Sequence, residues 1–267
     1  MGISPYNCAM PIIQRIKNAA NILRRDGLRA LIVAFISRNR LRLSIHNKFM
    51  WRSGVQYELR FWDDWFRTQG LQRPDKYQEK VNPEQPLQER LLPYLPAQAE
   101  VQILDVGAGP LTSLGKKTPG KTLHITAVDA LADDYDRLLA KYAVVPPVRT
   151  HKLDAETLAS RFPPASFDLV YASNAIDHVY DPEKAIVQML AVLKPGGYMV
   201  LEHYENEAEN ENYSGFHQWN FCMSPQGDFW ISSLTRKTNI SQKYAPLCEV
   251  SCSRMENKML FTVLHKR

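Results

Sequence analysis

The first residues whose types and spacing could bind a small molecule lie in the stretch LDVGAGPLTS, residues 104–113. Asp105 ends an apolar run, and Gly107 and Gly109 then open a glycine-rich turn. Asp129 follows a second apolar run, 20 residues after Gly109. A carboxylate at about that spacing can accept hydrogen bonds from both hydroxyls of a ribose. The pattern indicates a site for a ligand that contains a nucleoside.

Two residues after the glycines argue against a dinucleotide as that ligand. The dinucleotide fingerprint Gly-x-Gly-x-x-Gly would need a third glycine where Thr112 stands. Pro110 has no backbone N–H to offer a phosphate, and the carboxylate of Asp105 would repel one. A ribose-bearing cofactor with a positive centre and no phosphate fits these residues better. We therefore expect S-adenosylmethionine to be the cofactor.

The segments that must position these residues alternate between strand and helix. Five apolar runs predict buried strands at 101–106, 124–130, 148–155, 167–174 and 196–205. Helical segments separate most of them, notably 131–142 and 182–193. This alternation indicates a doubly wound parallel sheet in an α/β fold. Two further strands, 244–252 and 258–266, are joined by a short connection and predict a terminal hairpin.

Together these stretches resemble a known family, the class I S-adenosylmethionine-dependent methyltransferases. The matching residues are LDVGAGP, AVDA, KLDAE, the block from Phe167 to His203 that contains LKPGG, and the terminal hairpin. The resemblance is continuous over roughly 101–205. It implies a Rossmann-like seven-stranded sheet with an antiparallel last strand, and a methyl donor across the carboxyl ends of strands one to four. Leu111 stands where this family usually has a third glycine.

We expect the cofactor to contact residues at the ends of the first four strands. This set comprises Asp105, Gly107, Ala108, Gly109, Asp129, Ala130, Asp154, Ala155 and Asn174. Some members also have a structural alternative. Asp105 could hold its loop by accepting backbone amides, Asp154 could cap a helix that begins at Ala155, and Asn174 could be a turn residue.

Methyl transfer needs an aligned acceptor and a group that removes its proton. His178, after the fourth strand, and His203, at the end of the fifth, are the candidate general bases, because imidazole titrates near neutral pH. Asp177 and Glu202 are the candidate partners that orient them. Strand four is followed by SNAI rather than by Asn/Asp-Pro-Pro-Tyr/Phe, which disfavours methylation of an exocyclic nucleobase amine.

The segment at about 204–240 is the expected acceptor-site insert. Its FHQWNF, SPQG and DFWIS stretches together predict a β-hairpin that carries aromatic side chains. Because aromatic faces beside Glu, Asn and Gln can bind a polyol, we expect Tyr204, His217 and Trp219 to contact the substrate. The FHQWNF stretch also resembles methyltransferases from surface-polysaccharide contexts. The expected reaction is O-methylation of a glycan or another small polar hydroxyl compound.

The N-terminal segment is strongly basic and amphipathic. Residues 1–60 carry eleven Lys or Arg against two acids, and residues 11–46 have apolar side chains at helical spacing. We expect a helical arm and cap at 1–95, followed by the methyltransferase domain at 96–267. The arm either packs on that domain or a second subunit, or lies on an anionic membrane surface. Oligomer formation therefore stays open, and nucleic acid is not an expected partner.

The sequence contains no pattern for a membrane span, a leader peptide or a metal site. The longest apolar run, ALIVAFI at 30–36, is too short to cross a bilayer. The four cysteines form no Cys-x-x-Cys pair, and no motif is typical of a metal-dependent catechol-type site, so we expect no metal. We expect a cytoplasmic location, with the inner face of the membrane as a candidate peripheral site.

Three other functions remain as alternatives. The first is an RNA or a lipid/quinone methyltransferase, with the basic arm on phosphates. The second is a non-catalytic subunit that binds S-adenosylmethionine as a scaffold. The third, an NAD-dependent oxidoreductase, is disfavoured by the incomplete dinucleotide fingerprint.

Overall fold

The computed structural model describes residue 24 and residues 46–267. The predicted basic arm at 11–46 therefore lies almost entirely outside the described residues. The described α-helices are α2 (His46–Arg67), α3 (Pro74–Val81), α4 (Ala132–Lys141), α5 (Pro182–Val192), α6 (Glu207–Asn210) and α7 (Ile240–Tyr244). Short 3-10 helices are η1 (Glu89–Tyr94), η2 (Ala155–Ser160) and η3 (Ile176–His178). Over these residues, no helix combines the length and apolar character that crossing a membrane requires.

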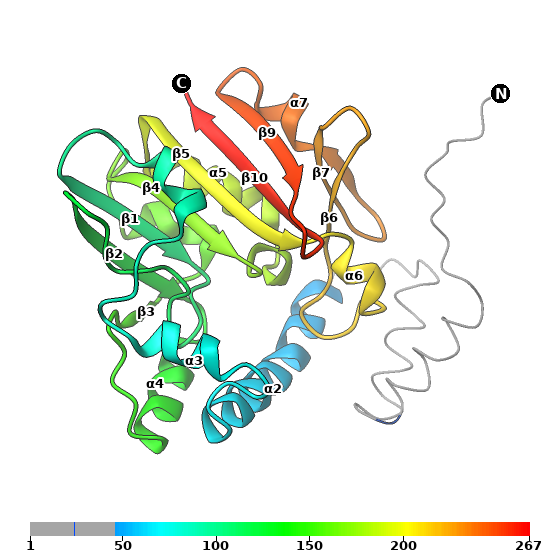
Figure 1. The fold of residues 1–267 in the computed structure, drawn as a ribbon. Helices are drawn as coiled ribbons and strands as arrows, with labels where there is room; N and C mark the ends of the chain where they lie inside the picture. The colour runs from blue at the N-terminus through cyan, green and yellow to red at the C-terminus, as the bar shows by residue number, and fades with distance from the viewer. Residues whose placement is uncertain (1–23, 25–45) are drawn as a thin grey trace.

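Seven strands form the main sheet, in the order β3-β2-β1-β4-β5-β10-β9. They are β1 (Glu100–Val106), β2 (Thr122–Asp129), β3 (Thr150–Lys152), β4 (Phe167–Ser173), β5 (Leu193–Tyr204), β9 (Cys248–Arg254) and β10 (Met259–Lys266). Strands β1 to β5 are parallel, whereas β10 runs antiparallel to β5 and β9 (Figure 1). The predicted Rossmann-like α/β fold, with seven strands and an antiparallel last strand, is confirmed.

Alternate residues of the central strands pack on opposite faces of the sheet. Leu104 of β1 belongs to the core cluster that includes Ile186 of α5. Its neighbour Ile103 belongs to a second cluster, together with Leu91 of η1. Because both faces are covered, the central strands are nearly continuous apolar runs, which is why the sequence predicted them as buried.

The insert after β5 forms a separate three-stranded sheet, in the order β6-β7-β8. Its antiparallel strands are β6 (Asn220–Met223), β7 (Phe229–Ser232) and β8 (Lys237–Asn239). The predicted hairpin of β6 and β7 is confirmed, and β8 extends it. Phe221 and Phe229 pack into the same core cluster as the main sheet, so these two aromatic residues anchor the insert.

Residues 244–252 do not form one strand as predicted. Helix α7 occupies the start of that segment, because the Asn239 side chain accepts a hydrogen bond from the Gln242 backbone N–H and caps the helix. A turn follows, in which Leu247 N donates to Tyr244 O. Pro246 in this turn has no N–H for a strand ladder, so β9 begins only at Cys248.

Helix α2 lies with α6 at the end of the sheet toward which the parallel strands run (Figure 1). Trp65 and Phe66 of α2 are buried against Tyr77 of α3 and Leu139 of α4. At its other end, Gly54 approaches the Phe216 ring so closely that an added Cβ would lie 2.4 Å from it. Helix α2 therefore bridges the main domain and the insert across the strand ends.

Candidate active site

A cavity of about 520 Å³ lies at the carboxyl ends of the parallel strands, where open α/β sheets bind their ligands. Its walls come from the loop after β1, the ends of β2, β3 and β4, helix α2 and the insert. All nine residues expected to contact the cofactor line it: Asp105, Gly107, Ala108, Gly109, Asp129, Ala130, Asp154, Ala155 and Asn174.

Asp129 fixes the glycine loop through its carboxylate. Oδ2 accepts a hydrogen bond from Gly109 N at 3.1 Å, and Oδ1 accepts one from Leu131 N at 2.8 Å. Gly107 and Gly109 have φ values of +71° and +65°, in the left-handed region that favours glycine. Burial raises the pKa of Asp129 to about 6, although the two backbone donors oppose this rise. A carboxylate has about four acceptor sites, so two remain for ribose hydroxyls.

Asp105 is buried and is held by a side chain. Its Oδ2 accepts a hydrogen bond from the Thr112 hydroxyl at 2.5 Å, not from backbone amides as the structural alternative supposed. Burial raises the pKa of Asp105 to about 6, while the Thr112 hydroxyl opposes this rise. The residue at the third-glycine position of a dinucleotide fingerprint therefore serves here to orient an acid at the cavity wall.

Asn174 and Asp154 complete this side of the cavity. Asn174 has a left-handed backbone, with φ of 48°, and its Oδ1 is buried with no hydrogen-bond partner among the described residues. It is thus both a turn residue and an available acceptor. The Asp154 side chain makes no capping hydrogen bond to η2, so the capping alternative does not account for it.

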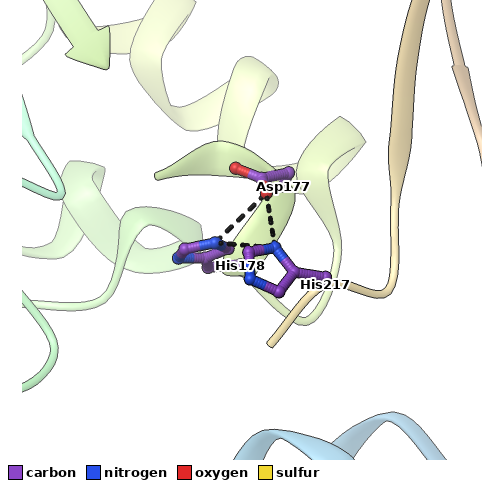
Figure 2. A group of neighbouring side chains, drawn as sticks. All are labelled: Asp177, His178 and His217. Carbon is purple, nitrogen blue, oxygen red and sulfur yellow. Dashed lines mark hydrogen bonds and ion pairs between the residues drawn. The ribbon is translucent and has the colours of Figure 1, made fainter. Parts of the chain in front are cut away.

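The same cavity is bordered by a cluster of Asp177, His178 and His217, drawn in Figure 2. The two rings line the cavity, and Asp177 is buried next to them. Asp177 Oδ2 lies 3.2 Å from His178 Nε2 and 3.5 Å from His217 Nδ1. The two ring nitrogens are 3.2 Å apart. The predicted catalytic pair at 177–178 therefore meets a residue from the predicted substrate set.

The charges in this cluster depend on one another. Burial alone would raise the pKa of Asp177, but the positive charge of His178 holds it well below its usual range. Burial likewise lowers the pKa of His178, but the Asp177 carboxylate more than offsets this and brings it to about 9. In this arrangement His178 carries a proton at neutral pH, and Asp177 stays ionised.

Comparisons with known proteins agree with this geometry. Residues 104–201 match a family described as Methyltransferase domain. The chain also resembles a chain of the complex between the Haloferax volcanii Trm112 methyltransferase activator and a methyltransferase, with a TM-score of 0.50 at 14% identity. That similarity covers 76% of this chain and 96% of the other, and at this identity it concerns the fold. This chain carries a class I S-adenosylmethionine-dependent methyltransferase domain.

Two curated relatives resemble parts of this chain. It is 31% identical over 154 residues to the ubiquinone/menaquinone biosynthesis C-methyltransferase UbiE of Stutzerimonas stutzeri (strain A1501), covering 55% of this chain and 57% of the relative. It is 28% identical over 141 residues to the ubiquinone biosynthesis O-methyltransferase of Albidiferax ferrireducens, covering 51% of each. The similarity thus spans about half the length of these relatives.

S-adenosylmethionine is the cofactor of this methyltransferase domain, and the residues at the cavity fit it. The acids Asp105, Asp129 and Asp154 place negative charge around a ligand that carries positive charge. The orphaned Oδ1 of Asn174 offers a buried acceptor to a ligand amine or hydroxyl. Which of these atoms each part of the cofactor contacts stays a prediction.

The structure gives His203 a positioning role instead of the predicted catalytic one. Its Nε2 lies 3.2 Å from Ala175 N and 3.0 Å from Ile176 N and accepts from both backbone N–H groups. The ring is 1% exposed and does not line the cavity. Burial lowers its pKa to about 4, against the charge of Asp177, so the ring is neutral. His203 therefore holds the loop that carries Asp177 and cannot meet an acceptor.

Glu202 does not orient a histidine as predicted. Its carboxylate forms a two-pronged ion pair with Arg90, with Nε–Oε1 and Nη2–Oε2 distances of 2.7 and 2.9 Å. The side chain is buried and does not line the cavity. The alternation of β5 explains this arrangement, because neighbouring residues of a strand point to opposite faces of the sheet.

Two of the three predicted substrate residues lie away from the cavity. Trp219 is 4% exposed, packs in the main core and donates its indole N–H to Val179 O at 3.1 Å. Tyr204 is 43% exposed and lines a separate groove. His217 alone of this set reaches the cavity. Trp219 was mispredicted because its ring anchors the insert to the core.

Helix α2 contributes cavity residues that the sequence pattern did not single out as functional. Trp51, Glu58 and Trp62 line the cavity, and an added Cβ on Gly109 would lie 3.0 Å from the Trp62 ring. Trp62 was grouped with Trp65 and Phe66 as an apolar helix face typical of core. The sequence did contain one signal, because Glu58 precedes Trp62 by four residues and so lies on the same helix face. In the structure, Glu58 accepts a hydrogen bond from the Trp62 indole N–H at 2.8 Å.

Proposed function

We propose that this chain is an S-adenosylmethionine-dependent methyltransferase that methylates a hydroxyl of a small polar acceptor. One observation carries the proposal: a single cavity is lined both by the expected cofactor residues, here called its cofactor side, and by His178 and His217 of the Asp177 cluster, here called its acceptor side. A donor and an acceptor held on these two sides would meet within the same cavity. Alignment of this kind supplies a large share of the catalysis in group transfer.

On the cofactor side, the proposal assigns each residue a separate task. Asp129 accepts hydrogen bonds from the ribose, and Asp105 supplies negative charge behind the glycine loop. Asn174 Oδ1 accepts a hydrogen bond from the cofactor. When bound, S-adenosylmethionine supplies an electrophilic methyl group on a positively charged sulfur.

On the acceptor side, Trp51, Trp62 and Phe216 provide apolar faces, and Glu58 and Glu207 provide hydrogen-bond acceptors. Aromatic faces beside carboxylates suit a ring that bears hydroxyl groups. Because these side chains come from α2 and from the insert, an acceptor bound between them would contact both elements.

In the proposed mechanism, the cluster takes up the acceptor proton. Of the two histidines predicted as bases, only His178 lines the cavity, and Asp177 orients it. The two rings share a hydrogen bond between His178 Nε2 and His217 Nδ1. The cluster must release its own proton before it can accept one, so transfer requires the deprotonated cluster.

We consider two classes of acceptor. A glycan or other polyol is supported by the carboxylates that stand beside the aromatic wall. A hydroxylated aromatic ring, such as a quinol, is supported by the number of aromatic residues lining the cavity and by the names of the two relatives, which act in ubiquinone biosynthesis. Both are O-methylations that use the same cluster.

A titration and an acceptor panel test the proposal. Calorimetry with S-adenosylhomocysteine should give one site per chain, and NAD should not bind. The enzyme should then transfer a labelled methyl group to members of a panel of nucleotide sugars, oligosaccharides and quinols, with mass spectrometry to locate the methyl group. Binding without transfer to any class would favour the scaffold alternative. A well-folded chain that binds no S-adenosylhomocysteine would refute the proposal.

A further inference from the structure

The ligating atoms of Asp177, His178 and His217 form a small triangle at the cavity wall (Figure 2). Its sides are 3.2, 3.2 and 3.5 Å long. Ligands bonded at about 2.0–2.1 Å to one tetrahedral metal ion lie roughly 3.3–3.4 Å apart. The three atoms therefore already have the spacing that a single ion would impose on them.

The described residues meet the hydrogen-bonding needs of this triangle only in part. Both oxygens of Asp177 are buried, and neither accepts a well-formed hydrogen bond from the described residues, although ring nitrogens lie nearby. The nitrogens of His178 and His217 that face each other can share only one proton along their contact. A cation bound to all three atoms would satisfy every lone pair that points into the triangle.

Glu207 of α6 offers a fourth ligand beside this triangle. Its Oε1 lies 4.0 Å from His217 Nδ1, and its Oε2 is buried without a hydrogen bond from the described residues. Glu207 also lines the cavity. With Asp177 it would bring two negative charges, which match the charge of a divalent ion.

The two loops that carry the ligands are fixed before any ion binds. His203 holds the backbone of Ala175 and Ile176 on one loop. Trp219, two residues after His217, donates its indole N–H to Val179 O and so ties the second loop to the first. Such supporting contacts orient metal ligands in proteins and raise the affinity of the site.

We propose that Asp177, His178 and His217 bind one divalent transition-metal ion, with Glu207 as a further ligand. Two imidazoles with carboxylates favour zinc, manganese, iron or cobalt over magnesium and calcium, which prefer oxygen ligands. The expectation of no metal failed to consider this set because His217 lies 39 residues after His178.

The role of the ion rests on the proposed function. In the cavity, the ion would take the acceptor oxygen as a fifth ligand beside these four side chains, and it would lower the pKa of the acceptor hydroxyl and orient it. The ion would then replace the ring proton of the cluster, and His178 would act as a ligand instead of a base. The acceptor proton would leave to solvent or to a carboxylate.

Metal binding to the full chain tests the proposal directly. The protein is stripped with a chelator, dialysed, and titrated by calorimetry with Zn²⁺, Mn²⁺, Co²⁺ and Mg²⁺. We expect one site per chain for the transition metals and no binding of Mg²⁺. Bound Co²⁺ should give a visible spectrum that reports nitrogen and oxygen ligands.

Variants locate the site. Asp177→Asn and His217→Ala should each weaken metal binding by more than about 100-fold. Loss of a residue that only orients a metal ligand costs up to about that much, and these variants remove ligands themselves. The exposed His151 supplies the matched control, His151→Ala, which should bind the metal as the parent chain does. S-adenosylhomocysteine affinity and circular dichroism check that each variant is folded.

The outcomes separate the metal site from the proposed function. The metal proposal is overturned if the folded parent chain binds no transition metal. It is also overturned if metal binding persists in both variants, because the ion would then be held elsewhere, for example by cysteines. Methyl transfer that continues in the metal-free enzyme would also rule out the catalytic role of the ion. Metal binding that depends on the cluster, in a chain that methylates no acceptor, would leave the site in place and refute the proposed function.

Discussion

The two sides of the cavity are built in different ways. The cofactor side comes from a single stretch of chain, 105–174, in which each residue lies at the end of a strand or shortly after it. The acceptor side is assembled from helix α2, the loop at 174–180 and the insert at 207–217. Local patterns therefore specify the cofactor side, whereas packing between distant segments creates the acceptor side. Mutations on the two sides should have separable effects.

The largest expected effect is on the acceptor side. His178→Ala should lower kcat by about 10²- to 10⁴-fold, because it removes the group that handles the acceptor proton or its metal ion. The affinity for S-adenosylhomocysteine should change far less than kcat, because the glycine loop and Asp129 stay in place. Steady-state methyl transfer and calorimetry measure the two quantities, with the exposed His124→Ala as the control. A parallel loss of cofactor binding would contradict the separation of the two sides.

On the cofactor side, Asp129→Asn should weaken S-adenosylhomocysteine binding by about 100-fold. A hydrogen bond to a charged group contributes about 1.5–3 kcal/mol, and the Asn side chain keeps only one acceptor oxygen, so one ribose hydroxyl would lose its partner. Asp133→Asn, in the exposed first turn of α4, is the matched control. Calorimetry gives the dissociation constants. If both variants bound equally well, Asp129 would not contact the ribose.

Cofactor binding should weaken as the pH falls below 6. The pKa values of Asp105 and Asp129 are both raised to about 6, so the free chain loses these negative charges as pH falls through that value. A cationic ligand prefers the ionised form, and each group should weaken binding about tenfold one pH unit below its pKa. The stability of the ligand-free chain depends on pH in the opposite direction. Because these two pKa values are higher in the folded than in the unfolded chain, they increase the free energy of unfolding as the pH falls from 7 toward 4. An affinity independent of pH between 5 and 8 would contradict this coupling.

A smaller effect is expected at the loop that both sides share. His203→Leu should reduce the free energy of unfolding by about 1–3 kcal/mol, because the backbone N–H groups of Ala175 and Ile176 lose their acceptor. Urea denaturation measures this change. His203→Gln, which restores an acceptor, should recover part of the lost stability. A variant of unchanged stability with abolished methyl transfer would return His203 to the catalytic role that the sequence predicted.

The smallest effect is expected at Tyr204. This side chain is exposed in a separate groove, so Tyr204→Ala should change kcat/KM by less than about twofold, as exposed substitutions usually do. Methyl-transfer assays on the identified acceptor check it. A large rise in KM for a long acceptor would show that the substrate extends from the cavity into the second groove.

The sequence predicted most of the main domain because its signals are local. Buried parallel strands are continuous apolar runs, and the start of β1 and the bounds of β4 and β10 were predicted to within a residue. The segment at 244–252 was mispredicted because the Asn239 cap and Pro246 outweigh its apolar character. In the insert, the hairpin was predicted correctly, but sequence could not tell which of its aromatic residues face the core.

The same contrast explains the site residues. Gly109 and Asp129 are recognisable from their spacing, because both belong to one unit made of β1, the loop after it and β2. Glu202 and His203 looked equally suited to catalysis, since both end a strand near the cavity. Their actual partners are Arg90 and two backbone amides, which no local pattern reveals.

By itself, the sequence determined the α/β fold, the class of cofactor and the residues at its side of the cavity, because continuous apolar runs and glycine turns act over short distances. Only the tertiary structure brought His217 beside Asp177 and His178, placed α2 over the strand ends, and removed His203 from the cavity. These contacts depend on core packing between segments far apart in the chain, and that packing decides which side chains reach the acceptor.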